Sequence, residues 1–237
     1  MLKIAHRGYV SNNCCENSSA AILKAIELDY DMVEIDIRET KDQKIVLSHD
    51  QNLNRIFGLD KKVSKLTLKE IQAKTRGKIL TLEAALKLCK NEIGLLIEVK
   101  DKKYSIDFLE EVYQLVKEYN LTSQVLIPPR KDLIEFYLGK LKVGISYSQV
   151  KEWSGEENLA AKVFVLGMPN VWNEKKIRKM HDKNLLCLTT VKRTYFARNF
   201  PAENHLRLAK AAIQRLKKLE IDAVNIDSWY HQFLFDG

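Results

Sequence analysis

Short apolar runs that favour β-strands recur nine times along this chain, and stretches with helical periodicity separate most of them. The runs cover residues 2–5, 32–37, 45–48, 95–99, 124–127, 142–146, 162–166, 185–189 and 223–226. Strands that alternate with helices are typical of repeated βα units around a parallel sheet. The pattern therefore favours two architectures, an open doubly wound sheet or a closed barrel.

The link between the second and third runs helps to decide between them. Only six residues, 38–43, join these runs, whereas a parallel crossover needs about a dozen or more. The third run must return as the antiparallel strand of a hairpin, which leaves eight strands for parallel pairing. Eight is the count of a (β/α)8 TIM barrel. An open doubly wound sheet would normally have a Gly-rich first βα turn, but here that turn contains Gly8 alone.

We therefore expect an α/β protein, a single TIM-barrel domain over residues 1–237, with a β-hairpin after strand 2 and a small polar insertion at residues 51–80. Helices are expected at residues 17–28, 82–89, 106–119, 131–138, 174–182 and 202–219. Within the insertion, Thr67 and Glu70 match a capping box that opens a short helix, and Thr81 is a good N-cap for residues 82–89.

Composition limits the compartment and the partners. Lys and Arg outnumber Asp and Glu by 39 to 31, and this basic balance suits an anionic partner. The lysines are dispersed without a basic arm, which disfavours nucleic acid. No apolar stretch approaches the roughly 18 residues of a membrane span, and the N-terminus lacks a signal-peptide pattern. The four cysteines form no C-x-x-C motif. We expect a soluble cytoplasmic protein with reduced thiols, a small anionic substrate and no stable membrane insertion; the sequence indicates no oligomeric state.

Polar side chains collect at strand ends. Glu34 and Asp36 alternate along one strand and face the same way, roughly 6.5 to 7 Å apart. The hairpin returns His49 to about their level, and Glu98 follows the same alternation on the next parallel strand. A lone E-x-D pair often lines only a solvated edge. Here, however, His6 also follows directly after a predicted strand, so polar side chains collect at several strand ends. The active sites of TIM barrels lie at the carboxyl ends of the strands.

These residue types suit one kind of chemistry. Three clustered carboxylates raise one another's pKa unless a positive charge lies among them, and a hard divalent ion, Mg²⁺ or Ca²⁺, is the natural occupant of an all-oxygen site. Zinc would usually recruit histidines; His6 and His49 have no zinc-site spacing and are left for proton transfer. Arg7 and Lys100 suit phosphate oxygens. The pattern indicates metal-dependent cleavage of a phosphodiester.

The order of these motifs resembles that of the glycerophosphodiester phosphodiesterase family, densely over residues 3–100 and more sparsely afterwards. The matching residues are His6-Arg7-Gly8, Glu16-Asn17-Ser18, Glu34-x-Asp36, Thr40-x-Asp42, His49-Asp50, Leu53-x-Arg55, Leu66-Thr67, Leu80-x-x-Glu83 and Glu98-x-Lys100. Departures from the family pattern include Cys15 in place of a proline and the closing sequence Ile226-Asp227-Ser228-Trp229. They leave the identity of the alcohol moiety open.

The resemblance implies a TIM barrel that hydrolyses glycerophosphodiesters to sn-glycerol 3-phosphate and an alcohol with one divalent cation. It implies that His6 and His49 are the general acid and base, that Arg7 and Lys100 bind the substrate phosphate, and that the metal ligands are Glu34, Asp36 and Glu98. Glu16 is expected to orient Arg7 or a histidine, and Asp50 to support the His49 loop. The pattern distinguishes neither Mg²⁺ from Ca²⁺ nor water from a substrate hydroxyl as the nucleophile.

Two alternatives stand beside this hypothesis. Sphingomyelinase D-like or lysophospholipase D-like enzymes cleave phospholipids with a similar set of residues. The missing signal-peptide pattern and the Glu98-x-Lys100 motif weigh against the former. A non-catalytic binding barrel would be expected to lose a catalytic histidine or a metal ligand, yet all five of these residues are present.

Overall fold

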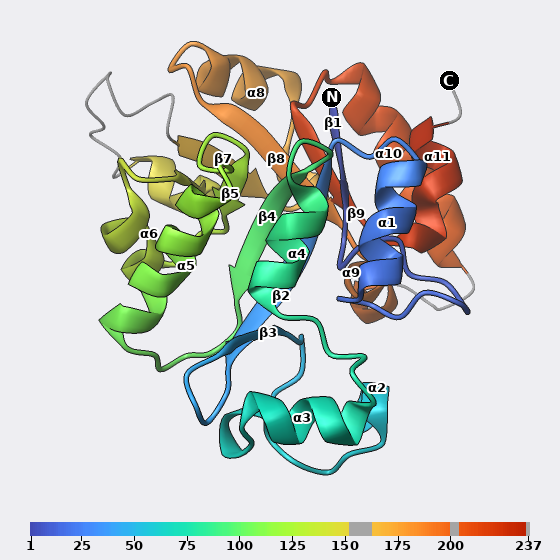
Figure 1. The fold of residues 1–237 in the computed structure, drawn as a ribbon. Coiled ribbons are helices and arrows are strands. Elements are labelled where there is room, and N and C mark those ends of the chain that lie inside the picture. The colour runs from blue at the N-terminus through green and yellow to red at the C-terminus, as the bar shows by residue number, and fades with distance from the viewer. Residues whose placement is uncertain (152–162, 200–203, 236–237) are drawn as a thin grey trace. The chain divides into compact units, whose positions relative to one another are not determined.

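The computed structural model describes residues 1–151, 163–199 and 204–235, and all nine expected strands are present (Figure 1). They are β1 (Leu2–Ala5), β2 (Met32–Glu39), β3 (Ile45–Leu47), β4 (Gly94–Val99), β5 (Val125–Ile127), β6 (Lys142–Ser146), β7 (Val163–Gly167), β8 (Leu186–Val191) and β9 (Ala223–Ile226). The ends of these strands lie within two residues of the predicted ones. Residue 162, the predicted start of β7, lies outside the described residues.

Helices alternate with the strands as expected. They are α1 (Ser19–Glu27), α2 (Asn54–Phe57), α3 (Leu68–Thr75), α4 (Leu82–Cys89), α5 (Ile106–Glu118), α6 (Lys131–Tyr137), α8 (Glu174–His181), α9 (Arg193–Asn199), α10 (His205–Lys218) and α11 (His231–Phe235). The capping box at Thr67 is confirmed, because its side chain accepts from the Glu70 backbone while the Glu70 carboxylate accepts from the Thr67 backbone. Thr81 caps α4 in the same way with its hydroxyl. The predicted start of the last long helix, residue 202, lies outside the described residues.

The strands are hydrogen-bonded in the order β1-β9-β8-β7-β6-β5-β4-β2-β3, and β1 also pairs with β2. β3 is antiparallel to β2, whereas β2 with β4 and β8 with β9 are examples of the parallel pairing of the other strands. This is the strand order of a (β/α)8 barrel with one added strand, and the predicted fold class is confirmed. The chain comprises two compact units, Arg7–Val125 and Met1–His6 with Leu126–Gly237.

Within Arg7–Val125, the pairing of β2 with its neighbours sets the level of each side chain. Asp36 lies directly opposite Glu98 in the parallel register of β2 and β4. The hairpin pairs Ile37 with Leu47, and its turn is closed by the hydrogen bond from the Thr40 backbone N–H to the Lys44 carbonyl. The turn is therefore centred near residue 42, within the short link of residues 38–43 that predicted the hairpin.

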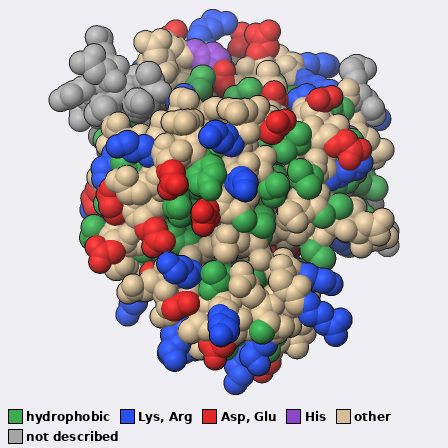
Figure 2. Space-filling model, in the orientation of Figure 1, with side chains coloured by type: hydrophobic (Ala, Val, Ile, Leu, Met, Phe, Trp, Pro, Cys, Tyr) green, Lys and Arg blue, Asp and Glu red, His purple; other side chains and the backbone are tan. Residues whose placement is uncertain are grey.

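The insertion after the hairpin has a small apolar core of its own. α2, α3 and the 3₁₀ turn Val63–Lys65 lie around this cluster of buried residues: Val46, Leu53, Val63, Leu66, Ile71 and Ile79. The exposed side is basic, and Figure 2 shows Lys and Arg gathered at the end of the view where α2 and α3 lie. Its exposed lysines are Lys61, Lys62, Lys65, Lys69, Lys74 and Lys78. The predicted polar insertion is thus a small layer that packs on Val46 of β3 and has a basic surface.

The other unit contains β1 together with β6–β9. β1 pairs in parallel with β9, so that Ala5 lies opposite Ile226. The residues that follow these two, His6 and Asp227, therefore emerge side by side. Large buried side chains, among them Phe164, Trp172 and Tyr230, fill the interior of this unit. In the part of the chain that the structure describes, no helix combines the length and apolarity needed to cross a membrane.

Candidate active site

Three carboxylates from two neighbouring strands form the centre of the site. Glu34 and Asp36 are two residues apart on β2, and Glu98 lies opposite Asp36 on β4. One oxygen from each carboxylate lies within 4.8 Å of the others. Glu34 and Asp36 are 1% and 0% exposed, and Glu98 is partly buried. The structure therefore brings together the three predicted metal ligands.

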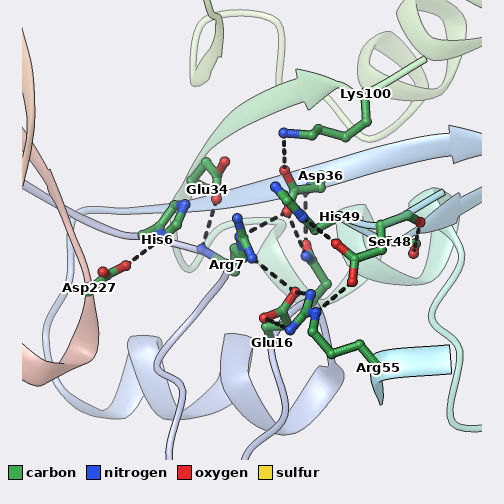
Figure 3. Close-up of polar contacts among 12 residues, drawn as sticks. His6, Arg7, Glu16, Glu34, Asp36, Ser48, His49, Arg55, Lys100 and Asp227 are labelled. Atoms are coloured by element: carbon green, nitrogen blue, oxygen red, sulfur yellow. Dashed lines mark hydrogen bonds and ion pairs between the residues drawn. The ribbon is translucent and has the colours of Figure 1, made fainter. Parts of the chain in front are cut away.

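Two cations accompany these carboxylates. The Nζ atom of Lys100 lies 2.7 Å from Glu98 Oε1 and 3.5 Å from Asp36 Oδ1. The Nε atom of Arg7 lies 3.3 Å from Asp36 Oδ2, and the Arg7 backbone N–H donates to Glu34 Oε2 at 2.8 Å (Figure 3). Burial by itself lowers the pKa of Lys100, but the charges of Asp36 and Glu98 outweigh it and raise that pKa.

The donor set fits a divalent cation. Carboxylates clustered in a buried setting repel one another unless positive charge lies among them. Asp36 Oδ1 accepts no hydrogen bond from the described residues, although Lys100 lies at ion-pair distance. Clustered carboxylate oxygens, with no nitrogen or sulfur among them, are the ligands that Mg²⁺ and Ca²⁺ prefer.

Asn17 fixes the carboxylate of Asp36, a contact that sequence reasoning did not identify. Its amide nitrogen donates to Asp36 Oδ2 at 2.8 Å, and its amide oxygen accepts from the Asp36 backbone N–H at 2.9 Å. The Asn17 backbone has φ of 55°, in the left-handed region that asparagine tolerates better than most residues. The motif Glu16-Asn17-Ser18 marked this position, but only the folded chain shows what its side chain contacts.

His49 begins a second polar group at the end of β3. Its Nδ1 lies 2.7 Å from Asp50 Oδ1, and Asp50 Oδ2 accepts from Arg55 Nε at 2.5 Å. Burial alone would raise the pKa of Asp50, but the hydrogen bonds from Arg55 and His49 lower it to about 2. The expected support of His49 by Asp50 is present as a direct contact.

Glu16 connects the two polar groups. Its carboxylate accepts two hydrogen bonds from Arg55, at 2.9 and 2.6 Å, and a third from Arg7 Nη1 at 3.1 Å. Although burial acts to raise the pKa of Glu16, the hydrogen bond from Arg55 and the nearby cations lower it. A continuous chain of contacts thus runs from His49 through Asp50, Arg55, Glu16 and Arg7 to Asp36, as Figure 3 shows.

The groove beside His49 also reaches Lys100, one of the two phosphate-binding candidates. His49 and Lys100 line an open groove of about 620 Å³, together with Arg38, Asp50 and Arg55. The Arg38 side chain donates to the His49 carbonyl at 2.7 and 3.3 Å and pairs with Asp101. The backbone of His49 is therefore fixed from β2. Arg38 is a further supporting residue that the sequence patterns did not mark.

His6 has a partly buried acidic partner in its own unit. Its Nδ1 lies 2.5 Å from Asp227 Oδ1, and the Arg193 backbone N–H donates to Asp227 Oδ2 at 2.6 Å. Burial raises the pKa of Asp227, but the hydrogen bond and charge of His6 outweigh it, so that the pKa is lowered. Asp227 stood out in the sequence only as part of an altered closing motif, because no local pattern links residues 221 positions apart.

Comparisons with known proteins identify the family of the chain. The model of the glycerophosphoryl diester phosphodiesterase family matches residues 6–176, well over half of the chain. YhdW of Bacillus subtilis (strain 168) is 37% identical over 132 residues, which make up 52% of this chain and 54% of that protein. The chain spans about half the length of the curated relatives it matches.

Solved structures share the fold at low sequence identity. A glycerophosphoryl diester phosphodiesterase from Parabacteroides distasonis ATCC 8503 superposes with a TM-score of 0.78 at 19% identity, over 99% of this chain and 86% of that one. An Oleispira antarctica phosphodiesterase was solved with the product sn-glycerol-3-phosphate. It superposes with a TM-score of 0.72 at 18% identity, over 100% of this chain and 97% of that one. Since the family model covers most of the chain and begins at His6, this protein belongs to the glycerophosphoryl diester phosphodiesterase family.

Proposed function

We propose that the protein is a divalent-metal-dependent phosphodiesterase that hydrolyses glycerophosphodiesters to sn-glycerol 3-phosphate and an alcohol. The observation that carries the proposal is the cluster of Glu34, Asp36 and the partly buried Glu98, with two cations against it. Family membership supports the reaction class. The Oleispira antarctica relative, solved with sn-glycerol-3-phosphate, supports the product.

Glu34, Asp36 and Glu98 would hold the cation, Mg²⁺ or Ca²⁺. When bound, such an ion offsets the negative charge that develops on the phosphoryl oxygens. Asn17 would keep the Asp36 carboxylate in one orientation through its two hydrogen bonds. The described contacts supply this orientation before any ligand arrives, which reduces the reorganisation that binding requires.

Arg7 and Lys100 are proposed to bind the substrate phosphate. Arg7 offers a guanidinium already fixed by Glu16, and Lys100 offers an ammonium whose pKa is raised by its acidic neighbours. Lys100 therefore stays charged at neutral pH. Preorganised cations beside a phosphodiester stabilise the transition state more than flexible surface lysines can.

His6 and His49 are proposed as the general acid and base. In each, Nδ1 contacts a carboxylate, Asp227 for His6 and Asp50 for His49, and this contact sets the orientation and tautomer of the ring. We assign proton transfer to Nε2 in both. One histidine removes the proton from the nucleophile, and the other protonates the leaving alkoxide.

The test uses the purified protein with glycerophosphocholine and glycerophosphoethanolamine, followed by phosphorus NMR. We expect sn-glycerol 3-phosphate to form with Mg²⁺ or Ca²⁺ and to stop forming in EDTA. A cyclic phosphate intermediate would identify a substrate hydroxyl as the nucleophile. Cleavage of lysophospholipids in preference to the water-soluble diesters would instead favour the lysophospholipase D-like alternative.

Variants make the test specific. H49A and E34Q should each lower kcat by at least about 100-fold, because each removes a general acid-base group or a metal ligand. H231A is the matched control, since this histidine lies at the start of α11, and it should retain wild-type kcat. Full activity in H49A would contradict the assignment of His49. Absence of divalent-ion binding in a calorimetric titration of the wild-type protein would contradict the metal dependence.

A further inference from the structure

A second group of potential metal ligands lies in the unit formed by Met1–His6 and Leu126–Gly237. It consists of His181, Cys187 and Asp222, and one donor atom from each lies within 4.8 Å of the others. His181 is the last residue of α8, Cys187 is the second residue of β8, and Asp222 immediately precedes β9. The group thus lies at the amino ends of β8 and β9, whereas TIM-barrel reactions occur at the carboxyl ends.

The three segments already converge on the Asp222 carboxylate. His181 Nε2 lies 2.8 Å from Asp222 Oδ2, and the Cys187 backbone N–H donates to the same oxygen at 2.7 Å. The parallel pairing of β8 with β9 aligns Leu188 with Ala223, so the preceding residues Cys187 and Asp222 lie beside one another. Only a short connection separates the end of α8 from the start of β8, so His181 lies close to Cys187 and Asp222.

The three side chains differ in how far they are exposed to solvent, and the difference suits a bound ion. Cys187 is fully buried, whereas the side chain of Asp222 is 24% exposed and that of His181 is 42% exposed. An ion held here would have its thiolate side within the protein and its imidazole side toward solvent. Water could therefore reach it and supply a fourth ligand.

We propose that His181, Cys187 and Asp222 bind a Zn²⁺ ion, with water completing a tetrahedral set. A sulfur, an imidazole nitrogen and a carboxylate oxygen are the donors that zinc takes in proteins. Mg²⁺ and Ca²⁺ prefer oxygen donors alone, which are what the cluster of Glu34, Asp36 and Glu98 offers. The chain would thereby keep two kinds of metal at two sites, and the zinc would tie α8, β8 and the start of β9 together.

Binding must displace protons, and this gives the site a recognisable pH dependence. A cysteine binds zinc as its thiolate, so the Cys187 thiol must give up its proton when the ion binds. As the zinc–sulfur bond forms, the thiol proton passes to solvent. The ring nitrogen of His181 that binds the ion must offer its lone pair, so a proton on that nitrogen passes to solvent. Affinity should therefore rise about tenfold per pH unit for each proton released.

Cobalt is the probe, because Co²⁺ replaces Zn²⁺ in such sites and absorbs light differently with sulfur and with oxygen ligands. The full-length protein is stripped with EDTA, saturated with Mg²⁺ to occupy the acidic cluster, and titrated with Co²⁺. We expect a thiolate-to-cobalt charge-transfer band that saturates at one equivalent and is removed by one equivalent of Zn²⁺. The band should disappear in C187S and persist in the control C14S/C15S, which removes two cysteines from another loop.

H181A provides an independent test if the buried C187S change harms folding, because His181 lies on the surface. Its Zn²⁺ affinity, measured by competition with a chromophoric chelator, should fall by about 100-fold or more. The acidic-cluster variant E34Q should keep both the cobalt band and the zinc affinity. A wild-type protein without the band at saturating Co²⁺, or H181A with unchanged zinc affinity, would overturn the proposal. Neither result bears on the phosphodiesterase assignment.

Discussion

Arg55 holds Glu16 through two parallel hydrogen bonds, from Nη1 to Oε2 at 2.9 Å and from Nη2 to Oε1 at 2.6 Å. Its third nitrogen, Nε, donates to Asp50. One guanidinium on α2 of the insertion therefore joins the loop before α1 to the acid that contacts His49. A planar fork with donors in fixed directions is what makes this arrangement possible.

Replacement of Arg55 by lysine should lower kcat by about 10- to 100-fold with little change in KM. Lysine keeps the charge but cannot serve both carboxylates, and the loss of hydrogen bonds between charged groups costs about 1.5–3 kcal/mol. Steady-state kinetics on a water-soluble diester measures the effect. R76K, in the same insertion at the exposed end of α3, is the matched control. Equal kcat values for R55K and R76K would rule out a positioning role for Arg55.

Acid should remove stability that Asp50 provides. Its pKa in the folded protein is about 2, below the usual value near 3.9 for an unfolded chain. The carboxylate therefore contributes stability that is fully present above about pH 4 and is lost as pH falls through about 2. In urea unfolding, the gap in free energy between wild type and D50N should shrink over that interval. A gap that stays constant from pH 6 to pH 2 would show that the lowered pKa is not coupled to folding.

Local patterns were enough to predict the strands and the caps. Each strand is a short apolar run whose character does not depend on distant residues, and Thr67 is a cap because of a residue only three positions away. The short link between β2 and β3 likewise forces a hairpin whatever the rest of the chain does. These features yielded the fold class and placed Glu34, Asp36 and Glu98 on adjacent strands before any coordinates were considered.

The supporting contacts could not be predicted in this way. Asp227 meets His6 only because β1 and β9 pair in one register, and Arg55 meets Glu16 across 39 positions. Sequence periodicity gives the face on which a side chain lies, but it does not give its partner on a distant segment. The insertion shows the same limit, because its lysine-rich sequence concealed the apolar cluster that includes Leu66 and Ile71.

Gly8 should tolerate no side chain. Its φ of +81° belongs to the left-handed region, and an added Cβ would lie 2.7 Å from the Cβ of Ala21 in α1. G8A should therefore lower the free energy of unfolding by about 2 kcal/mol or more through backbone strain and overpacking together. G58A is the matched control, because Gly58 also has positive φ but nothing within 4 Å of the added atom. Similar losses in the two variants, measured by chemical denaturation, would exclude the clash as the cause.

Asp227 should control the protonation of His6 in the reaction. Asparagine keeps the size of the side chain, but it carries no charge and can present either oxygen or nitrogen to His6 Nδ1, so the correct tautomer is no longer enforced. For D227N we expect kcat to fall by about 100-fold or more, with little change in KM and a shifted kcat–pH profile. D29N, a change at a residue beyond the end of α1, should leave the profile unchanged. If D227N lowered thermal stability but kept kcat and its pH profile, Asp227 would be a structural partner of His6 alone, and the proposed role of His6 in proton transfer would lose its main support.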